Sequence, residues 1–166
     1  MLIKCTIDGV AQLLNENAEK PLNKILQERI ETFPSNSACR GAGCGNCAVL
    51  LNGQCVLSCL IPAFRLNNSV ILTIEGFRRT RPYRDIERAY TETGISPCEQ
   101  CYASKTLMIE GILNMLDIEN MRGTSLDKDL IEREMGMNSC KCLEMRQIET
   151  VIRVALKNRR NRIVRK

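Results

Sequence analysis

Three cysteines and three glycines share the nine positions of residues 39–47, in the stretch CRGAGCGNC. A fourth cysteine follows on an apolar segment, so that Cys39, Cys44, Cys47 and Cys59 have the spacing C-x4-C-x2-C-x11-C. We call these four residues the first quartet. Glycine accepts positive φ, and a backbone with that freedom can bring several thiolates together in one short loop.

The first three cysteines of this set match the plant-type spacing of [2Fe-2S] ligands. Gly41, Gly43 and Gly45 would let main-chain N–H groups point at the sulfurs, and such hydrogen bonds tune a cluster's potential. The alternative is a zinc knuckle at Cys44-x2-Cys47, which would be redox-silent. Because three cysteines share one glycine-rich loop and the fourth lies on a following strand, the pattern favours iron-sulfur.

A second set of four cysteines, the second quartet, consists of Cys98-x2-Cys101 and, 38 residues later, Cys140-x-Cys142. The two pairs would meet if the intervening helices fold back antiparallel. Taken alone, a C-x-C pair could bind zinc or consist of packed thiols. In a chain that already carries one iron-sulfur motif, it predicts a second cluster and an electron relay.

The period of the apolar residues changes along the chain. Alternation from Leu2 to Asp8-Gly9 predicts a β-hairpin whose second strand is near residues 11–14. A helix is expected over 21–30, and further strands over 48–51, 54–59 and 69–74, with Asn52-Gly53 as a type I′ turn. Helical spacing then predicts four helices over residues 85–93, 106–116, 126–135 and 143–157.

This change of period indicates an α+β protein with two domains. We expect a sheet domain over residues 1–76, a basic linker over 77–83, a helical domain over 84–158 and a basic tail over 159–166. Cys5 and Cys55 lie in apolar strands outside both quartets and are expected to be packed thiols. Phe33 and Phe77 are expected in the core.

Basic residues gather in two places. The first group could bind a partner across the linker or could be a solvated connector; it consists of Arg78, Arg79, Arg81 and Arg84. Seven of the 24 lysines and arginines lie between residues 151 and 166, with no acid among them, and a solvated helix end is the expected reading. The tail has no aromatic residue to stack bases, and two oxidised clusters would lower the formal charge of +5 to about +1. We expect no nucleic-acid partner.

Composition excludes several other classes of function. The chain has no histidine, so histidine-ligated zinc, Rieske ligation, histidine-held haem and an imidazole base are ruled out. It has no run of eighteen apolar residues and no apolar N-terminal segment, so we expect no membrane span and a cytoplasmic protein whose ten cysteines are reduced or metal-bound. No catalytic side chain is expected.

The two quartets, in this order, resemble those of the iron-sulfur small subunit of the molybdenum hydroxylases, the xanthine dehydrogenase and aldehyde oxidoreductase family. The resemblance rests on residues 39–47 and on further motif residues that extend over nearly the whole chain. These are Val49, Leu50, Gly53, Ser58, Cys59, Leu60, Ile61, Pro62, Ile86, Arg88, Ala89, Gly94 and the two late cysteine pairs.

The resemblance implies a β-grasp ferredoxin-like domain that holds one [2Fe-2S] cluster through the first quartet, near FAD on a flavin-binding partner subunit. It implies a four-helix-bundle domain that holds the other cluster through the second quartet, near a molybdopterin cofactor on another partner. The chain would carry electrons from molybdopterin to FAD as the iron-sulfur subunit of an oxidoreductase complex.

The chain departs from the family pattern only around the second quartet. The family usually has glutamine before the C-x2-C, Gly-Phe inside it and Thr-Pro-Gly after it, whereas Pro97, Glu99-Gln100 and Tyr102-Ala103-Ser104 stand here. Lys141 replaces an arginine, and residues 143–145 replace Thr-Gly-Tyr. Because these positions face the molybdopterin subunit in the family, a relay protein whose partner lacks molybdopterin stays open as an alternative. A zinc-stabilised interaction module that uses the basic tail is a further alternative.

Overall fold

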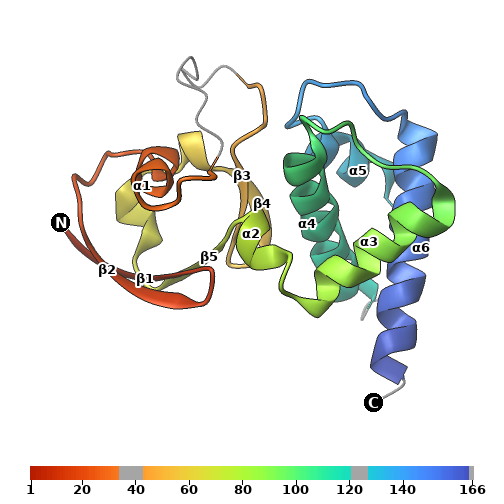
Figure 1. The fold of residues 1–166 in the computed structure, drawn as a ribbon, viewed down its shortest axis with the longest axis horizontal. Helices are drawn as coiled ribbons and strands as arrows, with labels where there is room; N and C mark the ends of the chain where they lie inside the picture. Colours follow the sequence, from red (N-terminus) through yellow and green to blue (C-terminus); the bar gives the residue numbers. More distant parts are fainter. Residues whose placement is uncertain (34–42, 121–126, 165–166) are drawn as a thin grey trace.

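The computed structural model describes residues 1–33, 43–120 and 127–164 of the 166-residue chain. It has a mixed architecture with a five-stranded sheet at one end and a group of helices at the other (Figure 1). Within the described residues, no helix is long and apolar enough to cross a membrane. In chain order the elements are β1 (Leu2–Ile7), β2 (Val10–Asn15), α1 (Leu22–Arg29), β3 (Ala48–Leu51), β4 (Gln54–Leu57), η1 (Ser58–Leu60), η2 (Ala63–Leu66), β5 (Ser69–Leu72), α2 (Ile74–Phe77), α3 (Arg81–Thr93), α4 (Tyr102–Asn120), α5 (Lys128–Met135) and α6 (Met145–Val164).

The strands are arranged in the order β2-β1-β5-β3-β4. Strands β1 and β5 are parallel, and the other neighbours are antiparallel. Both predicted hairpin turns are confirmed: Asp8 and Asn52 have φ of 51°, and the glycine after each has φ of 84°. Two consecutive residues with positive φ are the requirement of a type I′ turn, which Asp-Gly and Asn-Gly meet easily.

Two hydrophobic cores meet at the sheet. On one face, α1 packs against β1, β2 and β5, and Val49 of β3 joins this core. On the other face, α4 packs across β3 and β4, so that Leu50 and Cys55 belong to the helical core. Because neighbouring side chains of a strand point to opposite faces, β3 contributes to both cores. The sheet thereby fixes the loop before β3 against the helices.

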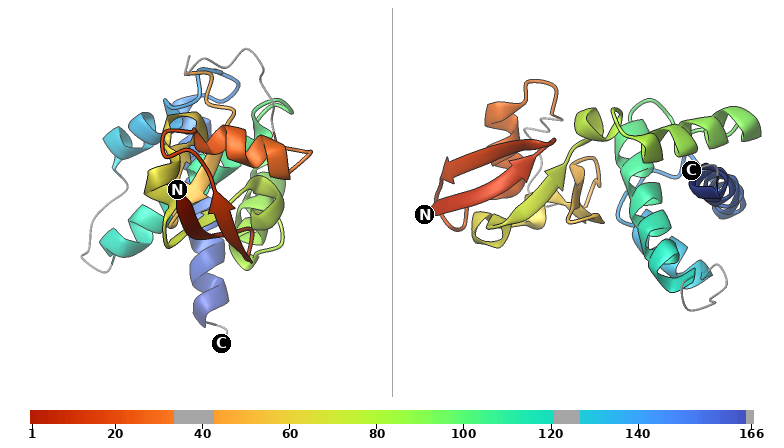
Figure 2. Two further views of the ribbon diagram at one scale, coloured as in Figure 1. Left: turned by 90° about the vertical axis from the view of Figure 1, so that its left-hand side faces the viewer. Right: turned by 90° about the horizontal axis from the view of Figure 1, so that it is seen from below.

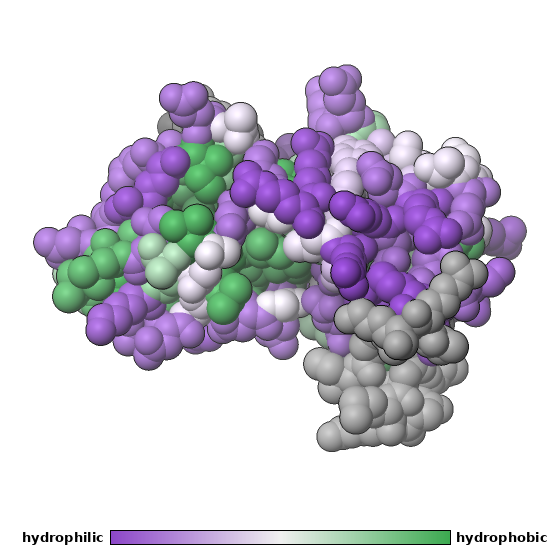
Figure 3. Space-filling model, turned by 60° about the horizontal axis from the view of Figure 1, so that its bottom comes forward, coloured by the Kyte–Doolittle hydropathy of each residue, from purple (hydrophilic) through white to green (hydrophobic). Residues whose placement is uncertain are grey.

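The face of β1, β2 and β5 that α1 does not cover carries exposed apolar side chains. Leu2, Leu13 and Val70 are each more than half exposed. Figure 3 shows this apolar area on the sheet end of the molecule, whereas the helical end is mostly hydrophilic.

Helix α3 begins at Arg81, four residues earlier than the sequence predicted, and a short helix α2 precedes it. The Thr80 side chain caps α3 by accepting from the Tyr83 N–H, and Pro82 occupies the first turn. Proline is favourable there because its missing N–H and fixed φ suit a helix start.

Two arginines near the end of α6 are not solvated as the charge pattern predicts. Helix α6 continues to Val164 and lies beside α3 (Figures 1 and 2). Arg159 is only 4% exposed and pairs with Glu110 of α4. Arg162 donates from Nε to Oδ2 of the buried Asp85 at 2.9 Å. The expectation is therefore wrong for these two residues, because buried carboxylates on α3 and α4 attract them.

Candidate metal centre

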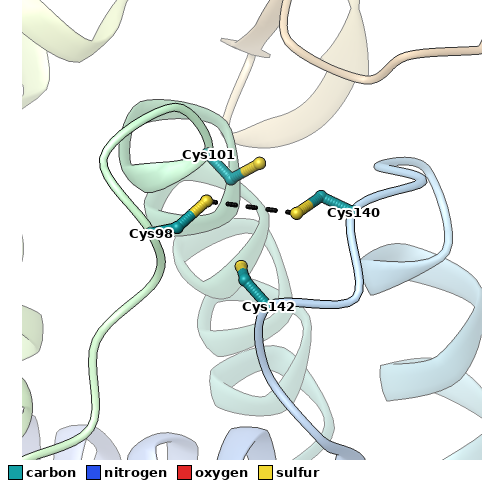
Figure 4. Close-up of side chains that lie close together, drawn as sticks. All are labelled: Cys98, Cys101, Cys140 and Cys142. Carbon is teal, nitrogen blue, oxygen red and sulfur yellow. Dashed lines mark hydrogen bonds between the residues drawn. The ribbon is translucent and has the colours of Figure 1, made fainter.

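The second quartet gathers at one end of the helical group. Cys98 and Cys101 lie in the turn that leads into α4, and Cys140 and Cys142 lie between α5 and α6. The four Sγ atoms are all within 4.8 Å of one another, and those of Cys98 and Cys140 are 4.0 Å apart (Figure 4). Segments 38 residues apart in sequence thus converge on one small volume.

Local hydrogen bonds place the first pair of this quartet. The Cys101 N–H donates to the Cys98 carbonyl at 3.0 Å, which closes the C-x2-C turn. The Lys105 N–H then donates to the Cys101 carbonyl at 2.9 Å, so the turn continues into α4. This continuity explains why α4 begins at Tyr102 rather than at the predicted residue 106.

An all-sulfur donor set fits zinc or an iron-sulfur cluster. Around one ion with bonds of about 2.3 Å, four sulfurs form a tetrahedron with edges of about 3.8 Å. Two irons need ligand pairs that stand further apart. The four sulfurs all lie within 4.8 Å of one another, which is close to the spacing of a single-ion tetrahedron, and they would have to separate to hold two irons. Cys101 is buried and the other three cysteines are half-buried, so the donor set is shielded on one side.

The pKa values of the Cys98, Cys101 and Cys142 thiols are shifted in different directions. The pKa of Cys98 is lowered, chiefly by the backbone N–H of Cys101. Burial raises the pKa of Cys101 to about 12 and also raises that of Cys142. Because thiolates are the metal ligands, binding at this quartet must release protons, most reluctantly from Cys101.

The first quartet is placed only in part. Cys39 lies outside the described residues, whereas Cys44 and Cys47 precede β3, and Cys59 lies in η1. Ser58 is fully buried and donates to the Cys47 carbonyl from both its N–H, at 3.1 Å, and its Oγ, at 2.7 Å. These bonds tie the segment that bears Cys59 to the end of the glycine-rich loop. Within the described ranges, the second quartet is the only potential metal-ligating group of three or more side chains.

The glycine-rich loop contacts the segment that leads to Cys140 of the second quartet. The Asn138 Nδ2 donates to the Asn46 Oδ1 at 3.0 Å, and Gly45 packs against the backbone of Met137 and Asn138. Asn46 and Asn138 are not among the residues predicted for the site. An asparagine two residues before a ligand can cap that ligand's N–H through an Asx turn, and this signal could have identified Asn138.

The two cysteines outside the quartets are packed thiols, as predicted. Cys5 is 6% exposed in the sheet core, and Cys55 is 5% exposed between β4 and α4. Burial raises the pKa of both and brings that of Cys55 to about 12. Phe33 and Phe77 are also buried, as predicted.

Comparison with known proteins gives a consistent family. Residues 10–138 match the family described as 2Fe-2S iron-sulfur cluster binding domain. The chain is 24% identical over 142 residues to 6-hydroxypseudooxynicotine dehydrogenase complex subunit beta from Paenarthrobacter nicotinovorans, covering 86% of this chain and 85% of that protein. It is 27% identical over 150 residues to the xanthine dehydrogenase iron-sulfur-binding subunit of Escherichia coli O157:H7, covering 90% and 91%.

A solved structure shares the fold. The aldehyde oxidoreductase from Desulfovibrio desulfuricans aligns over 96% of this chain with a TM-score of 0.71 and 19% identity. The match covers 17% of that much longer chain. At this identity the likeness concerns the fold alone.

Proposed function

Because the chain belongs to the family of 2Fe-2S iron-sulfur cluster binding domains, we propose that it is the electron-transfer subunit of a xanthine dehydrogenase-like hydroxylase. It carries two [2Fe-2S] clusters and relays electrons between a molybdopterin centre and FAD on partner subunits. The observation that carries this proposal is the convergence of Cys98, Cys101, Cys140 and Cys142 in a chain of this family.

In this proposal, each quartet holds one cluster in its own domain. Residues 1–76 form a β-grasp ferredoxin-like domain whose ligands are Cys39, Cys44, Cys47 and Cys59. Residues 84–158 form a four-helix-bundle domain whose ligands are the second quartet, residues 77–83 link the two, and residues 159–164 continue α6 rather than forming a separate tail. The Ser58 bonds to Cys47 and the packing of α3, α4, α5 and α6 around a shared core support this division.

The side chains of this protein position and shield rather than react. Bound iron-sulfur clusters supply the one-electron chemistry. The side chain of Cys101, one of the proposed ligands, is only 3% exposed and is therefore shielded from water. The hydrogen bond between Asn138 and Asn46 holds the loop of the first quartet beside the segment that leads to Cys140. In this proposal, substrate chemistry takes place on another subunit.

The partners are proposed from the names of the relatives, which are a subunit of a dehydrogenase complex and the iron-sulfur-binding subunit of a xanthine dehydrogenase. We propose a flavin-binding subunit and a molybdopterin-binding subunit, with FAD and molybdopterin held only there. A cytoplasmic location suits eight thiolate ligands, because reducing compartments keep thiols from pairing.

Anaerobic purification of the tagged full chain from its native host tests the proposal. We expect two larger subunits to copurify, with FAD and molybdenum each near one equivalent per chain. Dithionite-reduced complex should show two distinguishable [2Fe-2S] signals in electron paramagnetic resonance. A complex with both clusters and flavin but without molybdenum would contradict the proposal. It would indicate instead a relay protein whose partner lacks molybdopterin, the alternative that the departures from the family pattern at Ser104 and Lys141 favour.

A zinc-stabilised module is the second candidate, because the second quartet is compact enough to close further around a single ion. Its sulfurs all lie within 4.8 Å of one another, at most about 1 Å more than the edge of a zinc-sulfur tetrahedron. Metal analysis of the same sample separates the two functions. Zinc without iron would select this candidate and end the proposal of electron transfer.

A further inference from the structure

The side chain of Asn138 lies between the two quartets and is 4% exposed. Its Oδ1 accepts from the Cys140 N–H at 2.9 Å and from the Cys101 thiol at 3.7 Å. Its Nδ2 donates to the Asn46 Oδ1 and to the Ser104 Oγ, each at 3.0 Å. One buried amide therefore contacts both cysteine pairs of the second quartet and the loop of the first.

The partners of Asn138 fix the direction of its amide. The Cys140 N–H can only donate, so it must face the amide oxygen. The Ser104 hydroxyl donates to the Cys101 carbonyl at 3.1 Å, which leaves its oxygen to accept from the amide nitrogen. Ser104 is 2% exposed and occupies a position where a glycine could offer no such partner. The orientation is thus set by two independent hydrogen bonds.

The backbone closes the same junction. Gly45, with φ of 77°, lies so near Asn138 that a Cβ on Gly45 would overlap the Met137 carbonyl oxygen and the Asn138 Cα. No side chain fits between the loop of the first quartet and the segment that leads to Cys140. Because the packing is this close, a displacement of Asn138 would also displace the glycine-rich loop and the segment that leads to Cys140.

We propose that Asn138 is a positioning residue that couples the two quartets: its oxygen orients Cys140 beside Cys101, and its nitrogen holds the glycine-rich loop through Asn46. The inference rests on the proposed function in that it assigns a cluster to each quartet. Three of the four hydrogen bonds of the amide involve no thiol, so they would persist if Cys101 bound a metal as a thiolate.

Three variants test the coupling. Asn138→Ala removes all four bonds, and Asn46→Ala removes only the bond to the first loop. Asn158→Ala is the matched control, because Asn158 is an equally buried asparagine, at 7% exposed, whose amide donates to the Asp85 carbonyl away from the cysteines.

The first readout is hydrogen exchange of the Cys140 amide in iron-free protein. We expect exchange in Asn138→Ala to be faster by roughly fivefold or more, the effect of losing one hydrogen bond. The Asn46→Ala and Asn158→Ala variants should exchange close to the wild-type rate. An unchanged rate in a folded Asn138→Ala protein would overturn the orienting role.

The second readout is paramagnetic resonance of the iron-loaded, reduced protein. Asn138→Ala should shift the midpoint potential of the second cluster and weaken the relaxation enhancement that each cluster causes in the other. Asn46→Ala should weaken only the relaxation enhancement, and the control should change neither. An unchanged relaxation enhancement in Asn46→Ala would overturn the coupling. This result would be decisive even if Asn138→Ala does not fold. A wild-type protein with fewer than two clusters would contradict the proposed function instead, and hydrogen exchange would still decide the role of Asn138.

Discussion

The guanidinium of Arg159 on α6 donates to the carboxylate of Glu110 on α4 in the interior of the helical group. Both side chains are almost fully buried, with exposed fractions of 4% and 5%. A buried ion pair gains little over an apolar pair, but the loss of one partner leaves the other charge without compensation. This pair therefore makes the basic end of the chain part of the fold.

The Arg159→Met variant should lose about 3 to 5 kcal/mol of unfolding free energy, because Glu110 remains buried. The double variant Glu110→Leu/Arg159→Met should recover a large part of this loss. Urea denaturation of the iron-free protein measures both. A double variant that is less stable than Arg159→Met would show that the pair itself, and not the uncompensated charge, dominates.

Gly111 of α4 allows the helix to lie against β4. A Cβ at this position would be 2.8 Å from the Cys55 Cβ and 3.0 Å from the Cys55 backbone nitrogen. Helix propensity alone would make Gly111→Ala about 1 kcal/mol more stable. We expect instead that Gly111→Ala loses about 1 to 3 kcal/mol of unfolding free energy, because the added methyl group overpacks the contact with Cys55. A lower unfolding temperature than the wild type would support this close contact, and a higher one would contradict it.

The acidity of the cysteines predicts their order of alkylation in iron-free protein. Cys98 has a lowered pKa and is half-buried, so it should react with iodoacetamide at lower pH and faster than the others of its quartet. Cys101 and Cys55 should react slowest, because burial raises the pKa of each to about 12. Mass spectrometry of timed samples gives the order, with urea-unfolded protein as the control. Equal rates at Cys98 and Cys101 in the folded protein would contradict the assignment.

Cys55 also predicts a loss of stability in alkaline solution. Its pKa is raised from 9.0 to about 12 on folding, so above pH 9 the unfolded chain releases a proton that the folded protein keeps. Stability then falls as pH rises, by up to about 1.4 kcal/mol per pH unit for one group. Denaturation between pH 8 and 11 should show a shallower fall in Cys55→Ala than in the wild type, and parallel curves would be against this role.

Local sequence signals predicted the parts of the fold that depend on local chemistry. Asp8-Gly9 and Asn52-Gly53 gave both hairpins, and the first strand of each was placed within one residue. The cysteine spacings and accompanying motifs gave the resemblance to iron-sulfur subunits of the xanthine dehydrogenase and aldehyde oxidoreductase family, which the match over residues 10–138 and the relatives confirm.

Features that depend on distant partners could not be predicted. The parallel pairing of β1 with β5 joins residues more than 60 positions apart, and no local signal specifies it. Arg159 reads as one more charge of a basic tail, because its burial depends on Glu110, 49 residues away. The hydrogen bond between Asn138 and Asn46 likewise has no signal in the sequence around either residue.

Iron and acid-labile sulfide per chain, measured together with paramagnetic resonance on anaerobically purified, reduced protein, test the central claim most directly. We predict about four irons and four sulfides per chain and two signals, and Cys101→Ser should lose one signal and about half of the iron. A colourless wild-type protein, or one with a single signal that Cys101→Ser leaves unchanged, would contradict the assignment of a cluster to each quartet.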